Sequence, residues 1–261
     1  MKKIKLEYLN PFGAGVLCGT MPDELIKRFE NLSKEVLDKK ITEWNYQLVG
    51  RIYDEWKIPE LLYKDYNVDT FLELAFLRYV ESYYTNFRRI LNLSLRLPQK
   101  EFQKNGYKVQ IHRGDGWVNS MKEGEYNPTH HHTNCDLSSI FYLDDYQGDK
   151  PRDFKRTDTN HDGVYDLGGA TEFLMGSNMN GMIPQRTRDG KVRAGTGFPQ
   201  LTHFNVTPKK GDFMIFPSWL LHAVYPFIGK GERVSISINA AYTIDIGTDK
   251  VLKFAMQSAP S

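Results

Sequence analysis

From residue 106 onward the chain consists of short apolar runs separated by turn-forming residues. The runs are rich in Val, Ile, Phe and Tyr, with Gly, Asp, Asn and Pro between them: YKVQIH, WVNSM, LSSIFYL, ATEFLM, LTHFNV, DFMIFP and VSISINAAY. β-Branched and aromatic residues favour strands, and many short strands at regular spacing are typical of sandwiches, barrels and jelly rolls. This half therefore predicts a β-rich domain.

The first half predicts helices. One amphipathic segment follows Thr20, a candidate helix cap, and Pro22, and its apolar positions are Leu25, Phe29, Leu32 and Val36. A longer segment over about residues 69–91 carries an apolar stripe with charges on its other face. We therefore expect an α+β protein with a helical support region over residues 1–105, a β-rich core over 106–245 and a C-terminal tail over 246–261.

Charge and cysteine content exclude several classes of protein. The formal net charge of the 261 residues is +2, which gives no reason to expect nucleic acid or an anionic membrane surface as a partner. Only two cysteines occur, far apart, so no disulfide framework is expected. No run of 18 apolar residues is present, which predicts a cytoplasmic protein without a membrane span.

Three consecutive histidines suggest a metal site. In an extended segment His130 and His132 point to one face, and His131 points away. His222, which follows the strand-like run DFMIFP, is the best candidate for a third ligand. The alternative is a polar turn in which the imidazoles satisfy backbone groups, and spacing alone leaves both interpretations open.

Arg233 and Ser235 share one face of the last strand by the same alternation. An inward-facing guanidinium requires an anion, and with a neighbouring hydroxyl it suits a carboxylate. A diacid bound to the metal at one end could therefore contact Arg233 at the other. A buried salt bridge to an internal acid is the alternative.

Two stretches together resemble the iron(II)- and 2-oxoglutarate-dependent oxygenases, in particular their prolyl-hydroxylase-like branch with bacterial and phage members. They are WVNSMKEGEYNPTHHHTNCDLSSIFYL and GDFMIFPSWLLHAVYPFIGKGERVSISINA. QLVGRIYDEW, in the helical half, also looks like that branch, and the resemblance covers residues 47–242 with gaps. It implies a double-stranded β-helix, or jelly roll, whose mouth holds iron, supported by N-terminal helices.

The resemblance also implies roles for individual residues. His130, His132 and His222 match the metal ligands, Arg233 and Ser235 match the clamp for the distal carboxylate of 2-oxoglutarate, and Tyr142 and Asn119 match further cosubstrate contacts. Trp117 is expected to pack. The family's usual set is two histidines and one carboxylate, whereas the second ligand position here is His132; Asp136 is the alternative source of a carboxylate.

The activity implied by the resemblance is that of an Fe(II)- and 2-oxoglutarate-dependent hydroxylase, with dioxygen as cosubstrate and with a peptidyl proline or an amino-acid-like molecule as substrate. None of the side chains is expected to act as a catalytic acid or base. Two alternatives remain: a three-His iron dioxygenase that does not use 2-oxoglutarate, and a non-catalytic β-domain that binds a metal or calcium.

Two loops suggest additional roles. Residues 158–166 match positions one, three, five, six and nine of a calcium-binding loop, but position twelve is Gly169 where a Glu is usual. A hairpin loop is therefore favoured over a Ca(II) site. Residues 176–200 are Gly-rich and without pattern, which suggests a substrate lid. His112, His161 and His203 have no partner at ligand spacing and are interpreted as surface or core residues.

Overall fold

A computed structural model describes residues 6–9, 15–95, 108–144, 168–175, 185–186, 192–193, 203–206, 209–227, 231–245 and 251–252. Its helices are α1 (Asp23–Lys39), the short 3-10 helix η1 (Asn45–Gln47), α2 (Glu60–Asp65) and α3 (Asp69–Leu95). Its strands are β1 (Leu6–Leu9), β2 (Val16–Thr20), β3 (Asp54–Lys57), β4 (Lys108–Met121), β5 (Asn127–His130), β6 (Leu137–Tyr142), β7 (Thr171–Leu174), β8 (Gln185–Arg186), β9 (Val192–Arg193), β10 (His203–Val206), β11 (Asp212–Pro217), β12 (Leu221–Val224), β13 (Arg233–Asp245) and β14 (Val251–Leu252).

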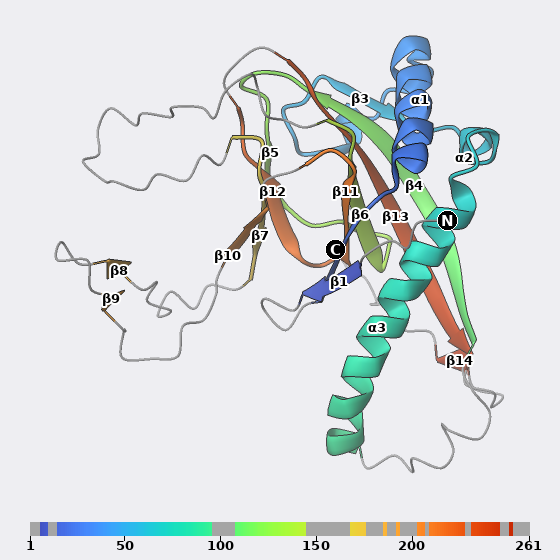
Figure 1. The fold of residues 1–261 in the computed structure, drawn as a ribbon, viewed down its shortest axis with the longest axis vertical. Coiled ribbons are helices and arrows are strands. Elements are labelled where there is room, and N and C mark those ends of the chain that lie inside the picture. The colour runs from blue at the N-terminus through green and yellow to red at the C-terminus, as the bar shows by residue number, and fades with distance from the viewer. Residues whose placement is uncertain are drawn as a thin grey trace.

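The β-rich half forms two facing antiparallel sheets. The larger sheet has the order β1-β2-β11-β6-β13-β4-β3, with β14 paired to β13, and the smaller has the order β10-β7-β12-β5. Successive strands from β4 to β7 and from β10 to β13 alternate between the two sheets, which is the winding of a double-stranded β-helix. The predicted jelly roll is confirmed, with the helices on one side of it (Figure 1).

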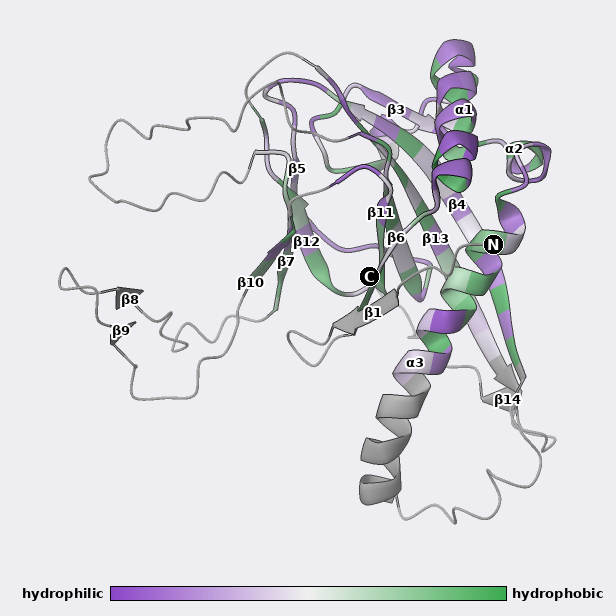
Figure 2. Ribbon diagram, viewed as in Figure 1, coloured by the Kyte–Doolittle hydropathy of each residue, from purple (hydrophilic) through white to green (hydrophobic). Residues whose placement is uncertain are grey.

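The two long helices cover the outer face of the larger sheet. Helix α1 buries Ile26, Phe29, Leu32 and Val36, which recur at helical spacing, and Figure 2 shows green apolar positions among the purple polar ones along this helix. Phe29 stacks on Phe141 of β6 with ring centroids 5.1 Å apart. The same core contains Leu72 and Phe76 of α3. Both predicted helices are confirmed.

One predicted cap is wrong. Thr20 ends β2, where its hydroxyl donates a hydrogen bond to Asp212 Oδ1 at 2.8 Å, so it is not available to cap α1. Pro22 occupies the N-cap position without a side-chain hydrogen bond. The pairing of β2 with β11 has therefore taken Thr20 into the sheet.

The larger sheet also recruits strands from the predicted helical region. β1, β2 and β3 all precede residue 105, and β3 pairs with β4 at one edge. The sheet therefore continues across the expected boundary between residues 105 and 106.

Two predicted loops are largely outside the described ranges. The calcium-loop residues 158–166 lie outside them entirely, and nothing else supports calcium binding. Of the predicted lid over residues 176–200, only the paired strands β8 and β9 are described. Within the described part of the chain, no helix is long and apolar enough to cross a membrane.

Candidate metal and cosubstrate site

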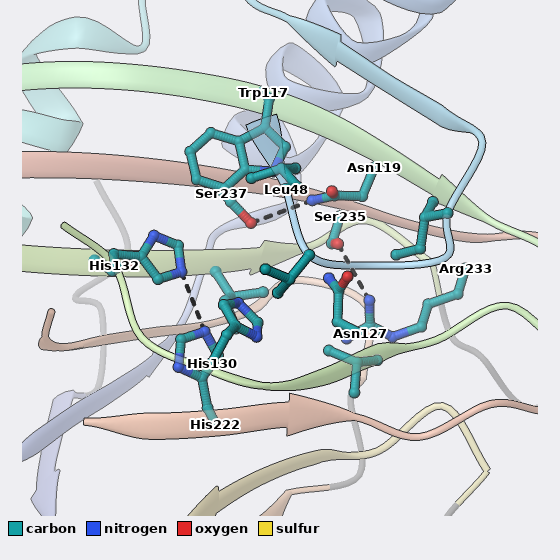
Figure 3. A pocket seen from close by; sticks show the side chains of 15 residues that line it. Leu48, Trp117, Asn119, Asn127, His130, His132, His222, Arg233, Ser235 and Ser237 are labelled. Carbon is teal, nitrogen blue, oxygen red and sulfur yellow. Dashed lines mark hydrogen bonds between the residues drawn. The ribbon is translucent and has the colours of Figure 1, made fainter. Parts of the chain in front are cut away.

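A pocket lies between the inner faces of the two sheets. Strands β4, β6 and β13 of the larger sheet and β5 and β12 of the smaller sheet contribute its walls, and Leu48, Val49 and Ile52 line it from the loop before β3. Figure 3 shows three imidazoles at one end of this pocket and Arg233 at the other.

The imidazoles of His130, His132 and His222 converge. Their candidate ligand nitrogens all lie within 4.8 Å of one another. His222 on β12 pairs directly with His130 on β5, and the Nε2 atoms of His132 and His222 are 3.2 Å apart. Two ligands at about 2.1 Å from one ion and at a right angle to each other are separated by about 3 Å. The spacing therefore suits a bound cation.

Each of the three rings is held through Nδ1. The Nδ1 atoms of His130 and His222 lie 2.7 Å from Pro128 O and 3.0 Å from Leu220 O, and that of His132 lies 2.9 Å from Asn239 Oδ1. Carbonyl oxygens only accept, so Nδ1 must carry the proton in each ring. The lone pair is then on Nε2, which is the form that a metal requires.

Burial keeps these rings neutral. Desolvation, with the neighbouring imidazoles as the second cause, lowers the pKa of His132 to about 4 and that of His222 well below its usual value. Desolvation also lowers the pKa of His130. Neutral imidazoles have lone pairs to donate, so the charge state of the cluster suits a metal.

Asp136 does not join the histidines. Its Oδ2 accepts a hydrogen bond from the backbone N–H of Tyr242 at 3.0 Å, and the metal-ligand cluster found in the described residues does not include it. Trp117 is buried and stacks on His132 with centroids 5.6 Å apart, as expected of a packing residue. The geometry favours three imidazoles over a set that includes Asp136.

Arg233 is buried without an acidic partner among the described residues. Its Nε donates to Gly169 O at 2.9 Å, Nη1 to Ser235 Oγ at 3.2 Å and Nη2 to Thr171 Oγ1 at 3.3 Å. Because a guanidinium has five N–H groups, one donor remains on each terminal nitrogen. A buried guanidinium whose N–H groups are not all used by these three bonds suits a carboxylate ligand.

The other predicted cosubstrate residues surround this guanidinium or the pocket. Tyr142 lies beneath it, 5.1 Å from ring centroid to Cζ, and shares Thr171 through a hydrogen bond of 2.7 Å. Asn119 lines the pocket, and its Nδ2 donates to Ser237 Oγ at 3.2 Å. Tyr142 therefore supports Arg233 from below, whereas Asn119 faces the pocket.

Sequence reasoning missed several supporting residues. Asn239 follows Arg233, Ser235 and Ser237 in the same alternation along β13, so extending that pattern by two steps finds it. Thr171 and Asn127 have no such local signal, because their positions depend on the packing of distant strands. His112 bonds Thr243 at 3.2 Å, away from the site; His161 lies outside the described residues, as does the side chain of His203.

Comparisons with known proteins agree with this arrangement. Residues 115–239 match the model of a family described as "Putative 2OG-Fe(II) oxygenase". That range contains the three histidines, Arg233 and Ser235. No curated protein matches the chain.

Solved structures with similarity to the chain include AviO1 from Streptomyces viridochromogenes Tue57, at 11% identity over 93% of this chain and 94% of that chain, with a TM-score of 0.48. HygX from Streptomyces hygroscopicus, with nickel and 2-oxoglutarate bound, shows 13% identity over 89% and 83%, with a TM-score of 0.45. A Pseudomonas putida prolyl-4-hydroxylase shows 14% identity over 88% and 92%, with a TM-score of 0.39.

Proposed function

We propose that the chain is a dioxygenase of the 2OG-Fe(II) oxygenase superfamily, whose family model matches residues 115–239, and that it uses iron(II) and 2-oxoglutarate to hydroxylate a peptidyl proline or an amino-acid-like substrate. The observation that carries this proposal is the arrangement of the pocket. Three neutral imidazoles converge at one end, and a guanidinium that has no acidic partner in the described part of the chain lies at the other.

His130, His132 and His222 would hold the iron through their Nε2 atoms. Each ring is fixed by its Nδ1 hydrogen bond, so little reorganisation is needed when the ion binds. Three ligands on one face leave the remaining coordination positions open.

Arg233 and Ser235 would bind the distal carboxylate of 2-oxoglutarate. The free donor on each terminal nitrogen of Arg233 allows a two-pronged contact, and Thr171 and Gly169 keep the guanidinium plane in place. Asn119 would contact the cosubstrate from the neighbouring strand, and Tyr142 would support Arg233 from below.

Bound iron(II) and 2-oxoglutarate would supply the oxidising power for inserting oxygen into a C–H bond. The protein's contribution is to bind, orient and exclude water. Leu48, Val49, Ile52, Ile140 and Val224 give the pocket its apolar lining. No side chain is needed as a general acid or base.

The surface beside the pocket supports a peptide-like substrate. Val49 lines the pocket and is 62% exposed, so it lies at the mouth. The same loop region exposes three further large side chains, Ile41, Tyr46 and Tyr53. Exposed apolar side chains in a loop that reaches a pocket are suited to contact with an extended ligand.

The three-imidazole set also favours a second candidate, a dioxygenase whose substrate chelates the iron and which does not use 2-oxoglutarate. In that enzyme Arg233 would bind the substrate's own carboxylate. The two candidates differ in whether 2-oxoglutarate binds the iron-loaded protein.

The test is an anaerobic titration of the metal-free protein with iron(II) and then 2-oxoglutarate, followed through the weak visible charge-transfer band of the chelate. We expect the band in the wild type, none in His222→Ala, and roughly 100-fold weaker 2-oxoglutarate binding with iron retained in Arg233→Leu. Arg78→Leu, on the exposed surface of α3, is the matched control. A folded wild-type protein that binds iron but gives no band would rule out the cosubstrate.

The substrate is tested separately. The iron-loaded protein is incubated with 2-oxoglutarate, oxygen and either proline-containing peptides or free amino acids, and the organic products are identified by mass spectrometry. We expect succinate together with a substrate heavier by one oxygen atom. Succinate accompanied by a different kind of product would remove the hydroxylase assignment while leaving the cosubstrate in place.

A further inference from the structure

Glu55 is a buried acid without a partner. It lies on β3, its exposed fraction is 0%, and neither of its carboxyl oxygens has a hydrogen-bond partner in the structure. No ion pair to Glu55 occurs among the described residues. A buried polar group without a partner is costly, so this side chain requires an explanation.

Glu55 stands at the end of a row of cosubstrate residues. It pairs directly with Asn119 of β4, Asn119 pairs with Ser235 of β13, and Ser235 pairs with Tyr142 of β6. Directly opposed residues of an antiparallel sheet face the same side, with Cβ atoms about 5 Å apart. Glu55 therefore shares the pocket face of the sheet with three residues proposed to serve 2-oxoglutarate.

If the acid is ionised, neither the Glu55 carboxylate nor the neighbouring Asn119 Oδ1 can donate a hydrogen bond to the other. Asn119 Oδ1 is buried and has no partner, while its Nδ2 donates to Ser237. Two opposed groups that can only accept repel each other. A proton on Glu55 resolves this conflict, because its O–H can donate to the amide oxygen.

We propose that Glu55 is a positioning residue that holds a proton and donates it in a hydrogen bond to Asn119 Oδ1. This bond fixes the amide plane, so that one Nδ2 hydrogen is directed to Ser237 and the other to the pocket. Without it, the amide could turn over and present an oxygen to the carboxylates of the cosubstrate. The inference rests on the proposed function, because it assumes that Asn119 contacts 2-oxoglutarate.

The charges around Glu55 support the protonated form. Burial, and secondly the like charge of Glu125 from the turn after β4, raise its pKa to about 8. Several charged groups around β3 bind other residues: Lys40 and Lys122 bind Asp54, Lys57 binds Asp115, Glu43 binds Asn45, and Glu232 binds Ser120. No cation among them neutralises Glu55.

The experiment measures 2-oxoglutarate binding to the manganese(II)-loaded protein by calorimetry between pH 7 and 9.5. We expect wild-type affinity to fall about tenfold as the pH passes 8. Glu55→Gln has an amide N–H that can donate at any pH. Its affinity should therefore stay, from pH 7 to 9.5, at the value that the wild type has at pH 7. Glu55→Leu should bind about tenfold more weakly throughout, with manganese affinity unchanged in every variant.

Two further variants test the route through Asn119. Glu55→Leu should have no additional effect in an Asn119→Ala background, because the group that Glu55 orients is then missing. Glu125→Gln should move the midpoint of the wild-type pH profile to lower pH, because it removes a like charge. Circular dichroism of each variant establishes that it is folded.

The outcomes separate the two proposals. If 2-oxoglutarate binds neither the wild type nor any variant, the proposed function fails. If it binds but the wild-type profile is flat, or Glu55→Gln behaves like Glu55→Leu, the positioning role fails. If calcium or magnesium stabilises the metal-free wild type but not Glu55→Gln, then Glu55 binds a cation and does not hold a proton. That result would also overturn the inference.

Discussion

At the residue scale, the metal site depends on three oxygens that orient the imidazoles. Two of them are backbone carbonyls, and the third is the side chain of Asn239, which makes it the one that substitution can remove. Asn239→Leu should lower metal affinity about 10- to 100-fold, because His132 loses the bond that fixes its tautomer. Calorimetric titration with nickel(II) measures this.

Asn239→Asp is the matched control, because a carboxylate still accepts from Nδ1. It should retain most of the metal affinity. Equal affinities for the wild type and Asn239→Leu would show that Ser138, whose Oγ lies 3.4 Å from Nδ1, and packing against Trp117 are enough to orient His132.

Glu55 should also make stability depend on pH. Its pKa is about 8 in the folded protein and near 4.5 when unfolded, so between these values the folded state binds more protons. Stability should therefore fall as the pH rises from about 4.5 to 8. Glu55→Gln lacks this loss and should be the more stable protein at pH 8, by roughly 5 kcal/mol, since each unit of pKa difference is worth about 1.4 kcal/mol.

Urea denaturation of both proteins at pH 5 and pH 8 is the measurement. Parallel changes in the wild type and Glu55→Gln would mean that the carboxyl is already ionised in the folded state.

Side-chain alternation in an extended segment predicts two pairs of the site residues, although β5 ends at His130 and His132 follows it. It places His130 beside His132, and Arg233 beside Ser235, and it would have reached Asn239. Glu55 could not be found in this way. In DEWK it looks like one of several solvated charges, and only the burial of β3 against β4 gives it a role.

At the element scale, α1 is held on the sheet by aromatic packing. Phe29 has an exposed fraction of 0% and stacks on Phe141. Phe29→Ala should cost about 3–5 kcal/mol of unfolding free energy, because it leaves a cavity between helix and sheet. Leu61→Ala on α2 is the control, since Leu61 is 71% exposed and should change stability by less than about 0.5 kcal/mol. Urea denaturation measures both changes, and a small loss in Phe29→Ala would mean that α1 is only loosely attached to the sheet.

The loop over the pocket has no room for a side chain at Gly50. A Cβ there would lie 1.6 Å from Asn127 Oδ1, while Arg51 N donates to Tyr126 O at 2.8 Å and holds the loop down. Gly50→Val should therefore displace the loop or Asn127 and weaken 2-oxoglutarate binding, which calorimetry measures. Adding Asn127→Ala should recover part of the loss. No recovery would indicate that the clash lies elsewhere.

The elements differ in how well sequence predicts them. The strands of the jelly roll and the two long helices have clear hydrophobic periodicity. β1, β2 and β3 were missed because they are four or five residues long and lie among Gly, Pro or charged residues. β2 and β3 pair with β11 and β4, which are distant in sequence, and no local pattern specifies such contacts; β1 pairs with β2 and so depends on it.

At the scale of the whole molecule, the main core and the pocket lie on opposite faces of the larger sheet. The helices pack on the outer face, and the histidines and Arg233 lie between the sheets. Removing the metal should therefore leave the fold intact. We expect unchanged far-ultraviolet circular dichroism after chelation, and stabilisation by about 2.7 kcal/mol when manganese(II) is present at 100 times its dissociation constant. Loss of secondary structure on chelation would contradict this separation.

The row formed by Glu55, Asn119, Ser235 and Tyr142 places a demand on strand length as well as on residue identity. A single-residue insertion or deletion in any of these four strands, upstream of its member, would turn that member to the opposite face of the sheet and put the adjacent residue of the strand in its place. Homologous enzymes that bind their cosubstrate in this way should therefore tolerate length changes in the intervening loops far better than in β3, β4, β6 or β13.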